Sequence, residues 1–349
     1  MNTEAIKIII PSIITFIVGI LLTPFVSSFL YKKKMWKKTS VEKTTDGQDA
    51  TITKILHSDH ARQTPRMGGI VVWGSVLVVV SLIFILDQTL GGFFTNFSFL
   101  SRSQTWIPFT ILIGAGLFGL IDDFLVCNDR GTYKGGGLSL LTRLLFVFSM
   151  SMFVACWLYF KLDMTSIHTF FSYSLEVGMW IVPLCVIVLV ALYSGGIIDG
   201  VDGLSGGVFA TMFSAYGVIA FAQGQGDLAA LCMSIVGGIL AFLWFNIPPA
   251  RFFLSETGSM ALTLTLGVVA FLTKEVLVLG IIALPLFITA LSSIIQLLSK
   301  KFRNGKQVFL VAPLHNHFQA LGWPAAKVTM RYWIISVFCS ISGIIIALL

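Results

Sequence analysis

Long apolar runs separated by short polar segments make up most of the chain. They fall at residues 6–30, 68–86, 106–124, 141–160, 178–198, 204–222, 227–246, 259–273, 276–298 and 329–348. A helix needs about 20 mostly apolar residues to cross the hydrocarbon core of a bilayer, whereas the strands of a membrane barrel alternate apolar and polar residues. The pattern predicts an all-α polytopic membrane protein with about ten spans, forming one domain over residues 1–349.

Composition supports this class. Hydrophobic residues make up 56% and charged residues 11% of the chain, against about 25% charged residues in soluble domains. The first apolar run is longer than a signal-peptide core and its lysines follow it, so we expect a retained span. The five cysteines are scattered, which indicates apolar filler rather than a disulfide framework or a zinc site. No nucleic-acid partner is expected.

Basic residues gather in two polar segments, 31–66 and 300–328. With about ten spans, both segments lie on the same face of the membrane, and few basic residues fall on the other face. Because cytoplasmic loops are enriched in lysine and arginine, we expect this face to be cytoplasmic and both termini to be extracytoplasmic. Arg143 and Arg331 lie inside span ends and are assigned to neither face.

Most candidate chemical groups fall on the same face, although basic residues alone set the topology. They are Asp122, Asp123, Asp129, Asp199, Asp202, Glu256, His315 and His317. A transporter more often carries ionisable residues in mid-span, along a path through the bilayer. The pattern therefore favours chemistry at the cytoplasmic surface of the membrane.

Two adjacent carboxylates, Asp122 and Asp123, lie at the end of the third span. Neighbours on a helix point about 100° apart, so the two can face different partners. Acids are disfavoured near a helix C-terminus, where the macrodipole is negative. A functional role is therefore favoured over a pair that merely faces water.

Asp199 and Asp202 lie in a glycine-rich stretch at residues 194–207. At this spacing, a helical turn would bring both carboxylates to one side. Clustered carboxylates indicate a hard cation such as Mg²⁺ where phosphates are handled; the alternative is a tight polar turn between helices. No Gly-Lys-Ser/Thr sequence closes the stretch, which excludes a P-loop.

Three further motifs fall on this face. Glu256 opens the eighth span, either as a functional carboxylate or as a partner of the helix dipole with Ser255 as cap. In an extended segment, His315 and His317 share one face and could contact a phosphate or leaving group. No Cys or third His lies nearby, so zinc is not expected. The Thr64–Gly69 segment fits either a site element or an ordinary loop-to-helix junction.

Together the motifs resemble the polyprenyl-phosphate sugar-1-phosphate transferases, and within them the phospho-N-acetylmuramoyl-pentapeptide transferases. The matching stretches are Thr64–Gly69, Ile121–Asp123, Asp199–Leu204, Phe242–Asn246, Glu256–Ser259, Ala312–Phe318, Gly322–Pro324 and Arg331–Ser336. The last three stretches are similar to the muramoyl branch rather than to the N-acetylhexosamine branch.

The resemblance implies a bacterial inner-membrane enzyme, often a homodimer, that uses Mg²⁺. Such enzymes move phospho-MurNAc-pentapeptide from its UDP-sugar donor onto undecaprenyl phosphate in the lipid bilayer, giving lipid I and UMP. The matched catalytic positions are Asp122, Asp123, Glu256, His315 and His317, with Glu256 and Asp123 as metal ligands. The matched substrate-binding positions are Asp199, Asp202, Gly203, Phe253, Gln296 and Asn316.

Several positions depart from the family's pattern. Glu256 replaces an Asp, Tyr193 and Gly196 replace asparagines, and Asn316 replaces the middle of three histidines. The Lys expected shortly before Thr64 is absent, with His60, Ala61 and Arg62 around that position. These departures leave two alternatives, a related transferase for another UDP-sugar and a silent or transport-like protein. The retained carboxylates argue against the second, because carboxylates at a membrane edge are costly.

Overall fold

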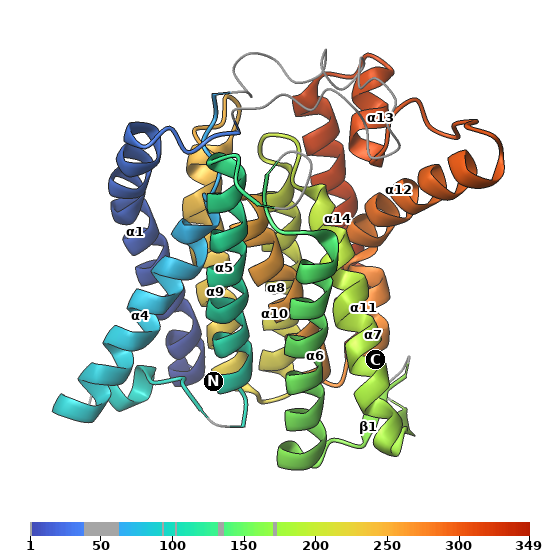
Figure 1. Cartoon of the computed structure of the whole chain (residues 1–349). Coiled ribbons are helices and arrows are strands. Elements are labelled where there is room, and N and C mark those ends of the chain that lie inside the picture. Colours follow the sequence, from blue (N-terminus) through green and yellow to red (C-terminus); the bar gives the residue numbers. More distant parts are fainter. Residues whose placement is uncertain (1, 38–62, 93, 102, 132–135, 170–172) are drawn as a thin grey trace.

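The computed structural model describes residues 2–37, 63–92, 94–101, 103–131, 136–169 and 173–349. Its elements form a bundle of mostly parallel and antiparallel helices (Figure 1). The helices are α1 (Asn2–Lys32), α4 (Gly69–Leu90), α5 (Trp106–Cys127), α6 (Leu140–Leu162), α7 (Ile181–Ser194), α8 (Leu204–Ala222), α9 (Gly226–Asn246), α10 (Ser255–Leu272), α11 (Val276–Ile282), α12 (Leu284–Phe302), α13 (Leu314–Ala320) and α14 (Ala325–Leu348). The 3₁₀ helices are η1 (Phe94–Phe97), η3 (Gly178–Trp180) and η4 (Gly195–Ile198).

The predicted membrane-spanning class is confirmed. In the described part of the chain, nine helices are long and apolar enough to cross a membrane, or up to ten if the bent pair α11–α12 is one span. The one addition to an all-α fold is a short antiparallel hairpin of β1 (Ser166–His168) and β2 (Ser174–Glu176), in which Ile167 pairs with Leu175. His60, Ala61 and Arg62, and most of the basic segment predicted at 31–66, lie outside the described residues.

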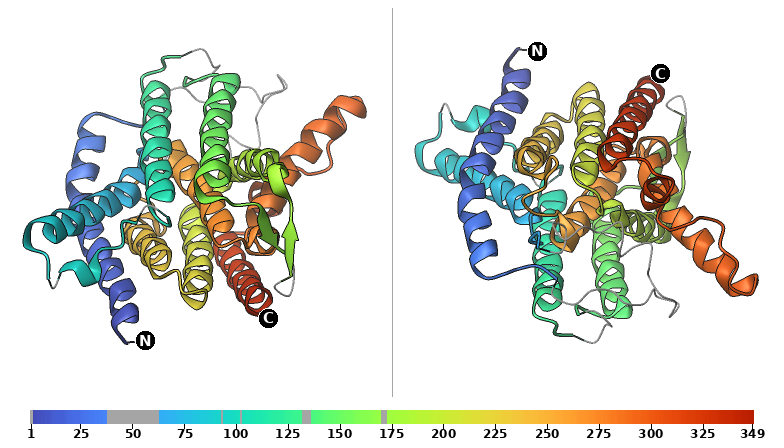
Figure 2. Two further views of the ribbon diagram at one scale, coloured as in Figure 1. Left: turned by 90° about the horizontal axis from the view of Figure 1, so that it is seen from below. Right: turned by 90° about the horizontal axis from the view of Figure 1, so that it is seen from above.

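The predicted span at 276–298 is present as a bent pair of helices, α11 and α12. The chain breaks at Ala283, and α11 and α12 are bent by 75°. Pro285 lies at the start of α12, where its ring is tolerated, but a continuous helix through this point would lose a hydrogen bond and clash with the preceding turn. As a result α12 points away from the other helices (Figures 1 and 2).

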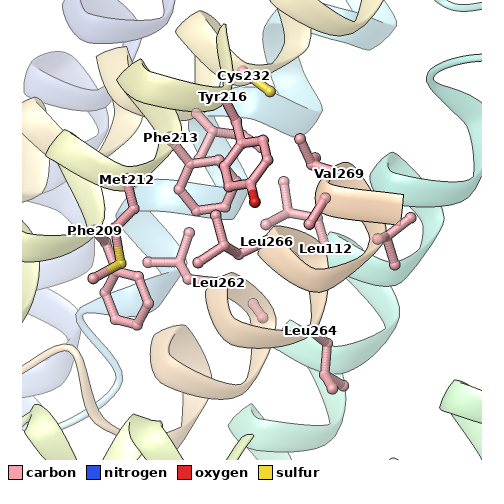
Figure 3. Packing of buried hydrophobic residues seen from close by; sticks show 14 of the residues in the cluster. Leu112, Phe209, Met212, Phe213, Tyr216, Cys232, Leu262, Leu264, Leu266 and Val269 are labelled. Carbon is pink, nitrogen blue, oxygen red and sulfur yellow. The ribbon is translucent and has the colours of Figure 1, made fainter. Parts of the chain in front are cut away.

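The core centres on α10. In the most apolar stretch of α10, 94% of the residues are buried, against 22% in the corresponding stretches of α1 and of α6. Apolar side chains of α10 pack against side chains of α5 and α8, among them Leu112, Phe209, Phe213, Tyr216, Leu262, Leu266 and Val269 (Figure 3). A helix that is apolar on all sides is stable only when neighbours surround it. The first turn of α10 is thereby held in a fixed place.

The two ends of the bundle differ. One end carries α13, the start of α10 and the end of α5, and is called here the α13 end; both termini lie towards the opposite end (Figure 1). The glycine-rich stretch between α7 and α8 also lies at the α13 end. The helices therefore bring the polar motifs from distant parts of the sequence to one end of the bundle.

Candidate active site

Close helix contacts build the frame of the site. A Cβ at Gly119 of α5 would overlap the carbonyl oxygen of Glu256 and stand 2.9 Å from Cα of Thr257. A Cβ at Gly69 of α4 would overlap the backbone of Gly258 in α10. Glycine is needed at both positions because the backbones approach too closely for a side chain. The ends of α4, α5 and α10 therefore meet beside the Asp122-Asp123 pair.

Asp123 is fully buried and joins three elements. Its Oδ1 accepts a hydrogen bond from Arg66 Nε at 2.9 Å, just before α4. Its Oδ2 accepts from the backbone N–H and the hydroxyl of Thr257, at 2.9 and 2.6 Å. Burial acts to lower the pKa of Arg66, but the charge and hydrogen bond of Asp123 outweigh it and raise that pKa above its ordinary value. Arg66 is therefore a permanent cation in the site.

Asp122 and Glu256 lie on either side of Arg143. Asp122 Oδ1 accepts from the N–H of Leu138 at 2.7 Å, while its Oδ2 lies 3.9 Å from Arg143 Nη1. Glu256 Oε1 lies 4.0 Å from the same nitrogen and accepts the hydroxyl of Tyr193 at 2.6 Å. The prediction that Asp122 and its neighbour face different partners is confirmed. The site thus contains three carboxylates and two guanidinium groups.

This donor set fits a cation held jointly with a substrate. The described residues contain no group of three or more His, Cys, Asp or Glu placed to hold a metal ion. Among the same residues, no donor reaches Glu256 Oε2 or Asp122 Oδ2 within hydrogen-bond distance. Mg²⁺ is commonly bound by one or two carboxylates, waters and substrate phosphates rather than by a protein cage. The two carboxylate oxygens satisfy that smaller requirement.

The glycine-rich stretch does not place its two carboxylates on one side, so that prediction is wrong. After η4 the backbone turns, and Gly203 adopts φ +74° before α8 begins. Asp199 accepts from the hydroxyl of Ser205 and from the N–H of Ser255, whereas Asp202 accepts from the N–H of Ala250. Each carboxylate satisfies a different backbone segment because no helix runs through this stretch.

Asp199 nevertheless holds the start of α10 through Ser255, the residue before Glu256. The Ser255 N–H donates to Asp199 Oδ2 at 2.6 Å, and Ser255 has φ +57°, a strained value for a residue with a side chain. Such strain persists only where neighbouring contacts enforce it, and it is frequent at functional sites. The alternative of Ser255 as a helix cap is not supported, since its hydroxyl has no hydrogen-bond partner among the described residues. Burial raises the pKa of Asp199, and the two hydrogen bonds oppose that rise.

The histidine motif also differs from its prediction. His315 and His317 lie in helix α13, not in an extended segment, so they do not share one face. His315 is buried beside the glycine-rich stretch, where a Cβ at Gly200 would stand 3.0 Å from its Nε2. His317 accepts a hydrogen bond from the N–H of Leu310. Only His315 therefore faces the Asp199 segment directly.

The remaining predicted binding residues lie in α12, in α13 and in the segments before α8 and α10. Gln296 in α12 accepts from the N–H groups of Val308 and Phe309 and donates to the Phe309 carbonyl, so it fixes the loop before α13. Phe253 bonds through its backbone to Pro65 and Gly68. The predicted substrate-binding Gly203 donates its N–H to Asn246, and Asn316 lies half-buried in α13.

Sequence reasoning missed three contributors, Arg66, Arg143 and Thr257. Arg143 carried a usable signal, because a charged residue in the first turn of a long apolar helix is costly and therefore suggests a role. Arg66 lies two residues before a glycine pair at a span start, but it lies among many basic residues. Thr257 lies in the matching stretch Glu256–Ser259, but its partner Asp123 could not be predicted because it lies 134 residues away.

Comparisons with known proteins show which family the chain belongs to. A family model described as glycosyl transferase family 4 matches residues 105–274. A phospho-N-acetylmuramoyl-pentapeptide-transferase from Thermodesulfovibrio yellowstonii is 34% identical over 309 residues, covering 82% of this chain and 78% of the relative. Proteins of the same name from a Geobacillus species (32% identical, 96% of each chain) and Rickettsia massiliae (31%, 98% of this chain and 91% of the relative) also match. With such identity over most of both chains, the protein belongs to the phospho-N-acetylmuramoyl-pentapeptide-transferase family.

Proposed function

We propose that this protein transfers phospho-MurNAc-pentapeptide from UDP-MurNAc-pentapeptide to undecaprenyl phosphate, forming lipid I and UMP. One observation carries the proposal: Asp122, Asp123 and Glu256 meet Arg66 and Arg143 at one end of an apolar helix bundle. Charges of both signs at the end of an apolar bundle suit a reaction between two phosphate groups, one of them on a lipid. Membership of the family supports the same reaction.

In this reaction an oxygen of the lipid phosphate attacks the phosphorus of the sugar-bound phosphate. The bond from that phosphorus to the oxygen shared with UMP breaks, and UMP leaves with the electron pair. A phosphate monoester has a second pKa of about 6, so the attacking oxygen is largely ionised at neutral pH and needs little help from a base. Phosphoryl transfer then depends mostly on positioning and on fixed charge near the departing oxygen.

The chain supplies both requirements. Arg66 and Arg143 place positive charge where the diphosphate and the leaving UMP would lie, without reorganisation during the reaction. Asp123 positions Arg66 and the first turn of α10. Mg²⁺ would be held by Glu256 together with Asp122 or Asp123, and when bound it neutralises charge on diphosphate oxygens.

On the nucleotide side we propose that Asp199, Asp202 and Gly203 shape the pocket wall rather than ligate a cation. Their polar atoms bind backbone segments that lead to α10 and to α9. Phe253, Gln296, Asn316 and the histidines of α13 would complete that wall. Because Gly196 in this wall departs from the family's pattern, this side would decide which donor binds.

We also propose that the α13 end faces the cytoplasm of a bacterial inner membrane, with both termini outside. Basic residues of the described chain gather there, including Lys32, Lys33, Lys34, Lys300, Lys301, Arg303 and Lys306, whereas the opposite end carries Lys7, Lys161 and Lys274. Cytoplasmic segments are enriched in such residues. The homodimer stays a prediction from the resemblance, and native mass spectrometry of detergent-purified protein would test it.

The test is an assay of purified protein with undecaprenyl phosphate, Mg²⁺ and a panel of UDP-sugars, scored by UMP release. We expect turnover with UDP-MurNAc-pentapeptide. Turnover with UDP-GlcNAc alone would instead identify a transferase for another donor. Release of no UMP from any donor would contradict the enzyme, and omission of Mg²⁺ tests the metal requirement.

A further inference from the structure

The two most unusual side chains of the site touch one another. The Tyr193 hydroxyl, in the last turn of α7, donates to Glu256 Oε1 in the first turn of α10 at 2.6 Å. A hydrogen bond of this length to a carboxylate is of the strong, charge-assisted kind. The two residues are separated by 63 positions in the sequence, so only the packing of α7 near α10 pairs them.

We propose that Tyr193 is a positioning residue that keeps Glu256 available to a divalent cation; this inference rests on the proposed function. The hydroxyl occupies Oε1 and leaves Oε2, which accepts no hydrogen bond from the described residues, for the cation. The flexible glutamate arm would otherwise sample several orientations. The hydrogen bond from Tyr193 restricts the Glu256 side chain to fewer of these orientations.

Arg143 explains why such a restraint is needed. Its Nη1 lies 4.0 Å from Glu256 Oε1 and 3.9 Å from Asp122 Oδ2, just beyond direct hydrogen bonding. If the Tyr193 hydroxyl were removed, Glu256 could close this gap and add a direct hydrogen bond to its existing ion pair with Arg143. That pair would compete with the cation for the same carboxylate. Tyr193 thus keeps the Glu256 carboxylate available to the divalent cation and prevents it from bonding directly to Arg143.

The first measurement is Mn²⁺ binding to the purified full chain in detergent, read by electron paramagnetic resonance with Mn²⁺ as the probe for Mg²⁺. Loss of a hydrogen-bonded partner of a ligating carboxylate costs about 10–100-fold in metal affinity, so we expect Tyr193→Phe to bind at least about tenfold more weakly. Tyr31→Phe is the matched control, because the Tyr31 hydroxyl donates to a backbone carbonyl, that of Arg251, and not to a carboxylate of the site. Equal melting temperatures in EDTA will show that each variant is folded.

A double-mutant cycle separates positioning from a general structural effect. Glu256→Asp shortens the arm by one methylene, so its carboxylate no longer reaches Tyr193. If the pair acts together, Tyr193→Phe added to Glu256→Asp should change Mn²⁺ affinity by less than about twofold, the limit expected of uncoupled sites. An equal loss in both backgrounds, or unchanged affinity in Tyr193→Phe alone, would overturn the inference.

The outcomes for the inference and for the proposed reaction are distinct. A wild-type protein that binds no Mn²⁺ would overturn the inference together with the Mg²⁺ requirement. A wild-type protein that binds Mn²⁺ but releases no UMP would contradict the proposed reaction only, since the titration still reads the effect of Tyr193.

Discussion

Arg66 Nε lies 2.9 Å from Oδ1 of Asp123, so a residue in the segment before α4 neutralises a fully buried carboxylate in α5. The Asp123 side chain has no exposed surface, while 30% of the Arg66 side chain is exposed. This pair links the basic segment to the reaction centre. It also predicts how the site responds when either charge is removed.

Arg66→Gln should destabilise the protein and abolish most turnover, because it leaves Asp123 buried and unpaired. Breaking a fully buried pair costs about 3–5 kcal/mol, and the exposed part of Arg66 should keep the cost to no more than about 3 kcal/mol. Thermal unfolding in detergent would measure it. The Arg66→Gln/Asp123→Asn double variant should recover part of the melting temperature but not activity. No recovery would contradict the claim that the unpaired charge of Asp123 causes the loss of stability.

Asp123→Asn should lower UMP release by at least about 100-fold, the size of effect seen when a preorganised electrostatic group is lost. The fold should survive, because the amide oxygen can still accept the hydrogen bonds of Thr257. Asp163→Asn at the opposite end of the bundle, exposed at the end of α6, is the matched control. Wild-type turnover in Asp123→Asn would remove this residue from the mechanism.

Gly119→Ala should shift the first turn of α10, because the new methyl would overlap the carbonyl oxygen of Glu256. Displacement of a reacting group by about 1 Å can cost about 100-fold in rate, so we expect a loss of that order in UMP release. Gly114→Ala on the same helix would meet only the flexible end of Met150, at 3.2 Å. Equal activity of the two variants would show that the close contact is unimportant.

Glu275 predicts a pH effect at the end of the bundle opposite the site. It is buried, and burial raises its pKa from 4.5 although His168, whose Nδ1 lies 2.8 Å away, acts to lower it. An acid with a raised native pKa contributes stability at low pH that is lost as pH rises through that pKa. The melting temperature of wild type relative to Glu275→Gln should therefore fall as pH rises above 4.5.

The control for that experiment is Glu176→Gln, an exposed glutamate on β2. Its melting temperature should follow wild type across the same pH range. UMP release should be unchanged in both variants, because neither residue lies at the α13 end. A wild-type curve parallel to that of Glu275→Gln would contradict the raised pKa.

The positions of most spans could be predicted because apolar length alone decides whether a helix can cross a bilayer. The expected run at 106–124 became α5 (Trp106–Cys127), for example, and the expected run at 204–222 became α8 (Leu204–Ala222). The run at 276–298 became the bent pair α11–α12, and the bend was not predicted because apolar length says nothing about it. The proline that marks the break lies at a helix start, where proline is ordinary.

Within the candidate site, the sequence by itself determined which carboxylates lie together at one end of the bundle, since charge avoids the apolar interior. It did not determine their partners. The backbone turn after η4 separates Asp199 from Asp202. His315 and His317 both lie in helix α13 and point to different faces of it. Arg66 with Asp123, Arg143 between Asp122 and Glu256, and Tyr193 with Glu256 are contacts between distant segments. Only the tertiary packing of α10 against its neighbours decided them, because hydrogen bonds depend on distances that sequence spacing does not encode.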